Sequence, residues 1–196
     1  HLSIRRQRQM CIRDRIVGAP NGDSSGLFND GRSFVVFGKT SGTAVQLTDV
    51  SGGVGGFAIR GTASNTKIGT SVSSAGDING DGLADLLVGA PEVSLSTTAT
   101  YRTGQSYVVY GKSNGTEVIV STAMNAALGF SITGEGYQDL TGSVVSAAGD
   151  INGDGLADLI LSADMRTVDG VNLAGRTYVI LGSTGGAFKT AVDVMG

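Results

Sequence analysis

The sequence predicts an all-β chain that is built from repeats of short antiparallel strands. Its composition supports this, because 32 of the 196 residues are glycine, two are proline and none is tryptophan. Glycine without a three-residue period, mixed with frequent branched residues, excludes collagen and disorder and suits strands joined by tight turns. A second observation is an internal repeat: residues 77–86, DINGDGLADL, return unchanged as residues 150–159, which is 73 positions later.

The strand-forming segments keep nearly the same spacing. Residues 34–39, FVVFGK, recur as YVVYGK at 107–112 and more loosely as YVILGS at 178–183, and GFAIRG at 56–61 recurs as GFSITG at 129–134. A unit of this kind holds four strands, which for the middle unit we expect near residues 71–76, 85–89, 105–111 and 128–133. We expect the first two to be buried on both faces, because they alternate poorly between apolar and polar residues. Four antiparallel strands per unit, repeated along the chain, form the blades of a β-propeller.

The repeated stretch carries side-chain oxygens at regular positions. In the first copy these come from Asp77, Asn79, Asp81 and Asp85, and glycines between them allow a tight curl of the backbone. Leu83 has no ligand side chain, so its backbone carbonyl is the natural contribution. Calcium takes about six to eight oxygen ligands from carboxylates, amides, carbonyls and water. The pattern therefore predicts a calcium loop, in which the cation offsets the repulsion among three carboxylates.

An EF-hand and a metal-free turn are the alternatives for this stretch. An EF-hand has a bidentate glutamate at position twelve and a helix on each side. Position twelve here is Val88, or Leu161 in the second copy, and the flanking residues read as strands. Asn-Gly and Asp-Gly are hairpin signals by themselves. A simple turn does not need aspartate at positions one and nine in both copies, so we favour a calcium loop at the tip of a β-hairpin.

Residues 16–196 resemble the FG-GAP repeats of the integrin α-subunit head and of many bacterial surface proteins. The resemblance lies in the loop at 77–85, the VGAP at 88–91 and the strand at 107–111. The Phe-Gly pair that the family has before the loop is replaced here at residues 68–69 and 141–142, which leaves the loop itself unchanged. The resemblance implies two Ca²⁺ sites, with the metal ligands Asp77, Asn79, Asp81, Leu83 and Asp85 in one and Asp150, Asn152, Asp154, Leu156 and Asp158 in the other.

The repeat divides the chain into an incomplete propeller of about two and a half blades. We expect residues 16–61 to form a partial blade, residues 62–134 a full blade with one calcium loop, and residues 135–196 a partial blade with the other. In the last unit the fourth strand is expected to be missing. Residues 1–15 hold five arginines and no glycine, so we expect a foreign or disordered lead-in, with a basic arm for anionic surfaces as the alternative.

The residue inventory excludes several kinds of function. The only histidine is His1 and the only cysteine is Cys11, so Ser-His-Asp, Cys-His and zinc sites are not available. We therefore expect no catalytic residues, no enzyme activity and no cofactor besides calcium. The net charge is −3 despite the arginines of residues 1–15, so the repeats have no basic face for nucleic acid. No apolar run approaches the roughly 18 residues of a membrane span.

The leading hypothesis for function is a calcium-binding repeat module of a secreted or cell-surface protein, with a structural or adhesive role. Its partner would be a surface protein or a glycan. The alternatives are an accessory propeller of a larger extracellular enzyme, such as a phospholipase or glycosidase, and a carbohydrate-binding module. The fold alone does not choose among them.

Overall fold

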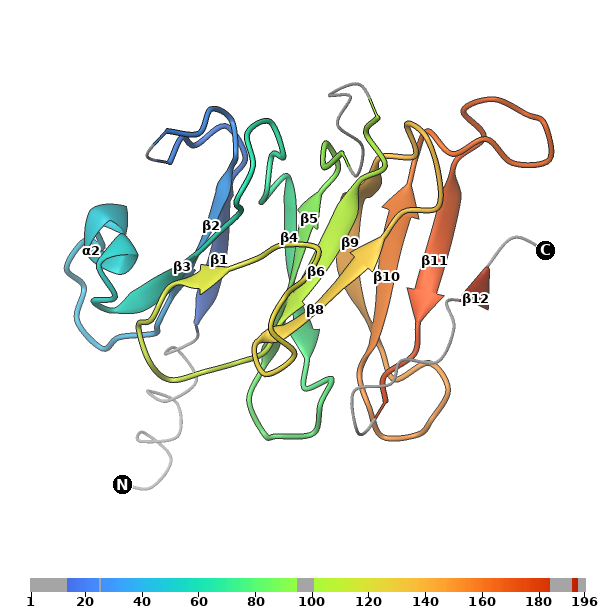
Figure 1. The fold of residues 1–196 in the computed structure, drawn as a ribbon. Helices are drawn as coiled ribbons and strands as arrows, with labels where there is room; N and C mark the ends of the chain where they lie inside the picture. Colours follow the sequence, from blue (N-terminus) through green and yellow to red (C-terminus); the bar gives the residue numbers. More distant parts are fainter. Residues whose placement is uncertain (1–13, 25, 95–100, 184–191, 194–196) are drawn as a thin grey trace.

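The computed structural model describes residues 14–24, 26–94, 101–183 and 192–193, and within them the chain is almost entirely β-structure. Three four-stranded sheets stand side by side in chain order, as the blades of a propeller do (Figure 1). The one helix of the described residues is the short α2, Leu47–Ser51. The sheets do not close into a barrel, so the arrangement is that of a partial propeller.

The middle sheet contains the complete unit of the repeat. Its order is β4-β5-β6-β8, with every neighbouring pair antiparallel. The strands lie at Ser71–Gly76, Asp85–Ala90, Gln105–Val109 and Gly129–Thr133, within two residues of the expected ranges. Strand β5 is buried on both faces, as expected, whereas β4 is mostly half-buried and only Ala75 is fully enclosed. The expectation for β4 was wrong because this strand is the inner edge of its sheet.

The third sheet has one strand more than we expected. Its order is β12-β11-β10-β9, and the short strand β12 pairs antiparallel with β11 through Val179↔Val192 and Tyr178↔Asp193. The expectation of a missing fourth strand was therefore wrong, because two residues are enough to continue the ladder. The four strands lie at Thr141–Gly149, Asp158–Ala163, Arg176–Ile180 and Val192–Asp193.

The fourth strand of the first sheet comes from the second repeat unit, residues 62–134. Its order is β1-β2-β3-β7, with strands at Arg15–Ala19, Arg32–Val36, Gly56–Arg60 and Val118–Ile119. Strand β7 comes from the connection between β6 and β8 and runs parallel to β3, unlike the antiparallel pairing that we expected throughout. The side chains of Val118 and Val120 are each only 1% exposed, and Glu117 forms a 2.9 Å ion pair with Arg60 of β3. Burial of these valines explains why the connection crosses to the neighbouring sheet.

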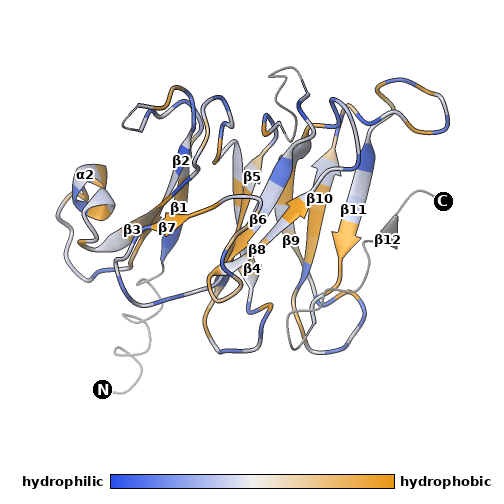
Figure 2. Cartoon of the chain, viewed as in Figure 1, coloured by the Kyte–Doolittle hydropathy of each residue, from blue (hydrophilic) through white to orange (hydrophobic). Residues whose placement is uncertain are grey.

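The core includes two apolar layers between neighbouring sheets, and a smaller cluster packs Val50 of α2 against Phe34 and Ala58 of the first sheet. One layer joins the first and middle sheets around Phe57, Ile59 and Val88. The other joins the middle and third sheets around Leu87 and Leu159 and includes residues of both. Figure 2 shows hydrophobic residues along strands such as β7 and β8. The blades are therefore held together face to face by apolar burial, which is the main source of stability in such a stack.

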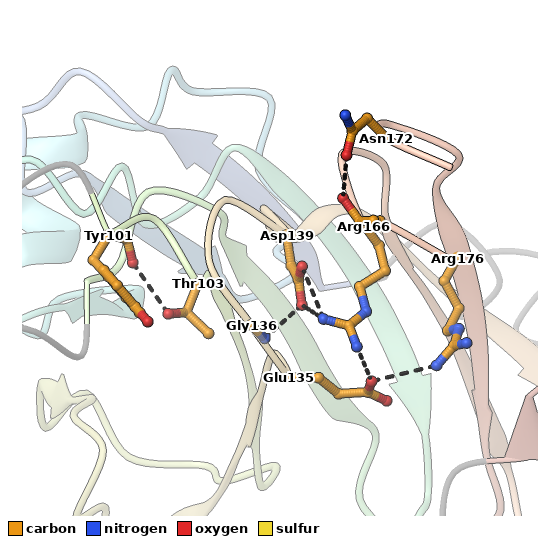
Figure 3. A network of polar contacts seen from close by, with 9 residues as sticks. Tyr101, Thr103, Glu135, Gly136, Asp139, Arg166, Asn172 and Arg176 are labelled. Atoms are coloured by element: carbon orange, nitrogen blue, oxygen red, sulfur yellow. Dashed lines mark hydrogen bonds and ion pairs between the residues drawn. The ribbon is translucent and has the colours of Figure 1, made fainter. Parts of the chain in front are cut away.

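A cluster of charged side chains ties the third sheet to the connection between β8 and β9 (Figure 3). Arg166, which follows β10, contacts Asp139 at 3.2 Å and Glu135 at 2.9 Å. Arg176 of β11 contacts the same Glu135 at 3.3 Å. The Asp139 side chain is only 1% exposed, and the backbone N–H of Gly136 donates to it at 2.6 Å. We call this group the Arg166 cluster.

At the equivalent positions of the preceding unit, two neutral residues stand where Arg166 and Asp139 stand in the cluster. Val93 takes the place of Arg166, because both donate their N–H to the alanine that ends the preceding strand and accept one from the glycine before the next strand. Thr66 stands 73 residues before Asp139 and is likewise buried. The chain thus contains neutral counterparts of the Arg166–Asp139 pair, beside which Glu92 forms ion pairs with Lys67 and Arg102.

Replacing Arg166 with valine is expected to lower the free energy of unfolding by about 3 kcal/mol, because the carboxylate of Asp139 stays buried without its main partner. The double change Arg166→Val with Asp139→Thr copies the pair Val93 and Thr66 and should recover most of that loss. Urea unfolding of the two variants and the parent protein measures both effects. A double variant no more stable than Arg166→Val would contradict the explanation.

Candidate metal site

The two acidic loops occupy equivalent positions in neighbouring sheets. Residues 77–84 join β4 to β5 and residues 150–157 join β9 to β10, and both loops project from the same end of the sheets, the lower end in Figure 1. The curl depends on Gly80 and Gly82, whose φ angles are +77° and +87°. Side chains other than glycine rarely adopt such angles. In the second loop Gly153 and Gly155 repeat them at +75° and +88°.

Asp77 organises the first loop around its carboxylate. Its Oδ1 accepts the backbone N–H of Gly80 at 2.8 Å and of Asp81 at 3.0 Å, and its Oδ2 accepts that of Gly82 at 2.8 Å. Three donated N–H groups hold this carboxylate inside the curl of the loop. The first aspartate therefore shapes the loop as well as supplying it with charge.

Asn79 and Asp81 are joined to each other across the loop. The Asn79 amide nitrogen donates to Asp81 Oδ2 at 2.9 Å, and its Oδ1 accepts the backbone N–H of Asp81 at 3.0 Å. The other Asp81 oxygen accepts the backbone N–H of Leu83 at 2.8 Å. The side chain of Asp81 is exposed and those of Asp77 and Asn79 are half-buried, so solvent ions can reach all three.

Asp85 has a different environment from the other acidic residues of the loop. It is fully buried at 0% exposure. Its Oδ2 accepts the N–H of Ile78 at 2.8 Å, and its Oδ1 accepts the N–H of Gly111, just beyond β6, at 2.8 Å. The ninth residue of the loop thus links the loop to two strands, a role that the ligand pattern of the sequence did not reveal.

Burial and the neighbouring carboxylates disfavour the charged form of Asp85. Burial raises the pKa of its carboxyl, the two backbone hydrogen bonds lower it, and the nearby charges of Asp81 and Asp77 raise it again, with a net upward shift. The pKa of the neighbouring Tyr110 hydroxyl is raised by burial and by the charges of Asp85 and Asp81. The end of the β4–β5 hairpin therefore carries excess negative potential.

The second loop reproduces the first contact by contact. Asp150 accepts the N–H groups of residues 153, 154 and 155 at 2.7, 3.1 and 2.9 Å. Asn152 donates to Asp154 at 2.8 Å, and Asp154 accepts the N–H of Leu156 at 2.9 Å. The buried Asp158 accepts from Ile151 at 2.7 Å and from residue 182 at 2.8 Å. The loop geometry is therefore a property of the repeat.

The first sheet contains a third aspartate of the ninth-position type. Asp14 Oδ1 accepts the backbone N–H of Gly38 at 2.7 Å, as Asp85 does from Gly111 and Asp158 from Gly182. The sequence signal was the spacing of Asp14 before residues 16–20, IVGAP, which matches that of Asp85 before residues 87–91, LVGAP. The repeat geometry thus includes Asp14, although Asp14 lies in residues 1–15, which we expected to be a foreign or disordered lead-in. Residues 1–13 lie outside the described residues.

The structure brings part of the expected ligand set together. Within each loop the residues at positions one, three and five are joined by hydrogen bonds, and the ninth lies beneath them on the strand. In the part of the chain that the structure describes, no three acidic, histidine or cysteine side chains gather into a metal-binding group. The carboxylates face backbone N–H groups, and the loops offer oxygen donors without nitrogen or sulfur ligands, which is the chemistry that hard cations prefer.

The described residues include no helix long and apolar enough to cross a membrane.

Known proteins match the chain in two ways. The family model described as FG-GAP repeat matches residues 68–109 and 141–180, which span the two loops and the strands around them. The chain is also 33% identical over 150 residues to a phosphatidylinositol-glycan-specific phospholipase D of Rattus norvegicus, and 34% identical over 152 residues to that of Mus musculus. Each match covers 76% of this chain and 16% of the relative. The chain therefore corresponds to a small part of those enzymes.

The sheets, the loops and the family match agree with one another. Each matched segment begins at or just before the inner strand of a sheet, contains one acidic loop and ends on the third strand. Residues 68–109 and 141–180 are therefore FG-GAP repeats within a partial propeller.

Proposed function

We propose that this chain is a calcium-binding FG-GAP segment of a secreted or cell-surface protein, in which calcium stabilises one end of the propeller. The observation that carries the proposal is the pair of acidic loops with one sequence and one geometry at the same end of adjacent sheets. Metal-free turns need no such repetition of all four side-chain oxygens. A stable propeller of this kind suits a structural or adhesive role, as in the integrin α-subunit head that the sequence resembles.

Each loop would hold calcium with oxygen atoms alone. In the first loop the donors are the side chains of Asp77, Asn79 and Asp81, the carbonyl of Leu83 and the carboxylate of Asp85. Asp77 Oδ2, Asp81 Oδ1 and both oxygens of Asp85 each accept a single backbone N–H and keep a second lone pair for a cation. The second loop offers the same set from Asp150 to Asp158. The cation would also relieve the repulsion that raises the pKa of Asp85.

Calorimetric titration with calcium is expected to give two ions per chain, with Kd values of about 0.1 to 1 mM, as in extracellular calcium modules. Asp81→Ala and Asp154→Ala should each reduce the stoichiometry to one, because each removes an exposed carboxylate from a single loop. Asp164→Ala, which removes an exposed acid outside the loops, is the matched control and should leave two sites. No bound calcium in the parent protein would refute the proposal.

A second candidate function is an accessory propeller of a larger extracellular enzyme. The observation that favours it is the similarity to part of phosphatidylinositol-glycan-specific phospholipase D. On this proposal the described repeats carry no catalysis of their own and position a catalytic domain encoded elsewhere in the same protein. Phospholipase activity of the whole protein that survives the loss of both calcium loops would favour a purely structural accessory role.

A further inference from the structure

The first sheet differs from the other two at its inner edge. In the middle and third sheets the inner strands β4 and β9 pair with the strands that follow the loops. In the first sheet the equivalent of β5 and β10 is β1. Among the described residues, the only strand that pairs with β1 is β2. The other edge of β1 therefore presents backbone groups of the kind that pair with an added strand.

A pocket of about 150 Å³ lies beside this edge, between the first and middle sheets. Ile16, Val35, Phe37 and Phe57 line it on the first sheet. The opposite wall includes Leu83, Ala84 and Leu86, at and just after the end of the first acidic loop. Asp14, Arg15 and Lys112 also line the pocket, and the Lys112 ammonium lies 4.2 Å from the centre of the Phe57 ring. The pocket therefore combines an apolar lining with one acidic and two basic side chains.

The same walls exist between the middle and third sheets, where they are covered. The rings of Phe37 and Phe57 lie 6.0 Å apart at 59°, and their counterparts Tyr110 and Phe130 lie 6.4 Å apart at 57°. There the apolar layer includes Ile78, the second residue of the acidic loop, at 0% exposure. The pocket between the first two sheets therefore lies where an equivalent isoleucine would pack.

Two further contacts show how closely the inner strand β4 and its loop pack against the third sheet. A Cβ atom on Gly76 would come within 2.6 Å of the Cβ of Ala157, and the counterpart of Ala157 is Ala84, which lines the pocket. The hydroxyls of Ser71 and Ser73 accept the backbone N–H groups of Val145 and Ala147 at 3.1 and 3.2 Å. The inner strand of one sheet thus binds the inner strand of the next.

Among the described residues, the Asp14 carboxylate accepts one backbone N–H group, whereas its counterpart Asp85 accepts two. Asp85 accepts one N–H from the glycine after the third strand and one from Ile78. Asp14 accepts from Gly38 through Oδ1, and no partner for its Oδ2 occurs among the described residues. The second residue of an acidic loop docked here would supply that N–H.

We propose that the groove along β1 binds the inner strand and acidic loop of an FG-GAP unit supplied from outside residues 14–196. The strand pairs antiparallel with β1, its isoleucine fills the pocket, and its backbone N–H donates to Asp14. Serines of the strand accept N–H groups from β4, as Ser71 and Ser73 do from β9. The basic side chains of Arg15 and Lys112, which line the pocket, attract the acidic loop.

The sequence of residues 6–13 does not provide this segment. Counting back from Asp14 as position nine, the loop positions one, three and five fall on Arg6, Arg8 and Met10, which are not oxygen ligands. No glycine occurs among residues 6–13 either, so the tight curl of the other loops is disfavoured there. A segment with the sequence of residues 70–83 fits each of the features described above.

Fluorescence anisotropy of a labelled peptide that copies residues 70–83, titrated with the full chain, tests the proposal. The matched control is the same peptide with the change Ile78→Asp, which should bind at least tenfold more weakly because aspartate cannot enter the apolar pocket. Hydrogen exchange should show added protection of residues 15–19. Equal affinity of the two peptides, or protection confined to other strands, would overturn the proposal.

The calcium dependence of this binding rests on the proposed function, whereas the strand pairing does not. With calcium at ten times its Kd, affinity should rise about tenfold, and Asp14→Asn in the protein should remove that gain. If the loops bind no calcium, the peptide should still bind in chelator with the same preference for isoleucine. Failure of the peptide to bind both the full chain and the chain without residues 1–13 would overturn the proposal while leaving the calcium stoichiometry intact.

Discussion

Replacing Asp85 with alanine is expected to lower the free energy of unfolding by about 3 kcal/mol even when no calcium is present. The carboxylate is fully buried and accepts the N–H groups of Ile78 and Gly111. Each buried N–H that loses its acceptor costs about 1 to 3 kcal/mol. The loss should therefore be visible in urea unfolding in excess chelator.

The substitution Asp85→Asn removes one of the two acceptor oxygens and so tests the hydrogen bonds from Ile78 and Gly111 separately from the loss of the whole side chain. Asp85→Asn keeps one acceptor oxygen and replaces the other with a donor, so about half of the loss or more should remain. Asp164→Ala, an exposed acid, should change stability by no more than about 0.5 kcal/mol. If Asp85→Ala destabilised the protein only when calcium is present, Asp85 would be a metal ligand without the structural role that we assign to it.

Removing calcium is expected to lower stability by nearly as much. With a Kd of about 0.1 mM and roughly 1 mM calcium, each occupied site contributes about 1.4 kcal/mol. Two independent sites would contribute nearly 3 kcal/mol, which for a chain of this length corresponds to about 6 to 12 °C in Tm. Thermal unfolding in calcium and in excess chelator measures the difference.

The loop variants assign that difference to its sites. Asp81→Ala and Asp154→Ala should each remove about half of the calcium-dependent shift in Tm, and the double variant should remove nearly all of it. Their melting curves in chelator should match the parent or lie slightly above it, because each change removes one repelling carboxylate. A parent curve that ignores chelator would reduce both loops to ordinary turns.

The strands of the middle unit could be predicted because their signals are local. The repeat fixes the alignment of equivalent strands, and branched or aromatic residues mark where each strand lies. The loop curl was equally readable, since Gly80 and Gly82 allow the positive φ angles that the structure contains. Each of these features depends on neighbours only a few residues away.

Features that depend on distant partners could not be predicted in the same way. Residues 45–47, VQL, and 118–120, VIV, occupy equivalent positions in the repeat. The second segment forms β7 beside β3, while the first leads into α2 with Val45 and Leu47 more than a third exposed. The neighbouring sheet decides between these outcomes. The burial of Asp85 was likewise invisible, because its partner Gly111 is 26 residues away.

The parallel strand β7 means that the unit of sequence and the unit of structure are out of phase. A cut at residue 62, where the second repeat begins, would leave the first sheet without β7, would expose Ile59, and would leave Arg60 without its ion-pair partner Glu117. Exchange of whole repeats between proteins of this family would therefore transplant an edge strand that belongs to the preceding blade. Recombination and engineering should succeed more often when a blade travels together with the connection between the third and fourth strands of its successor.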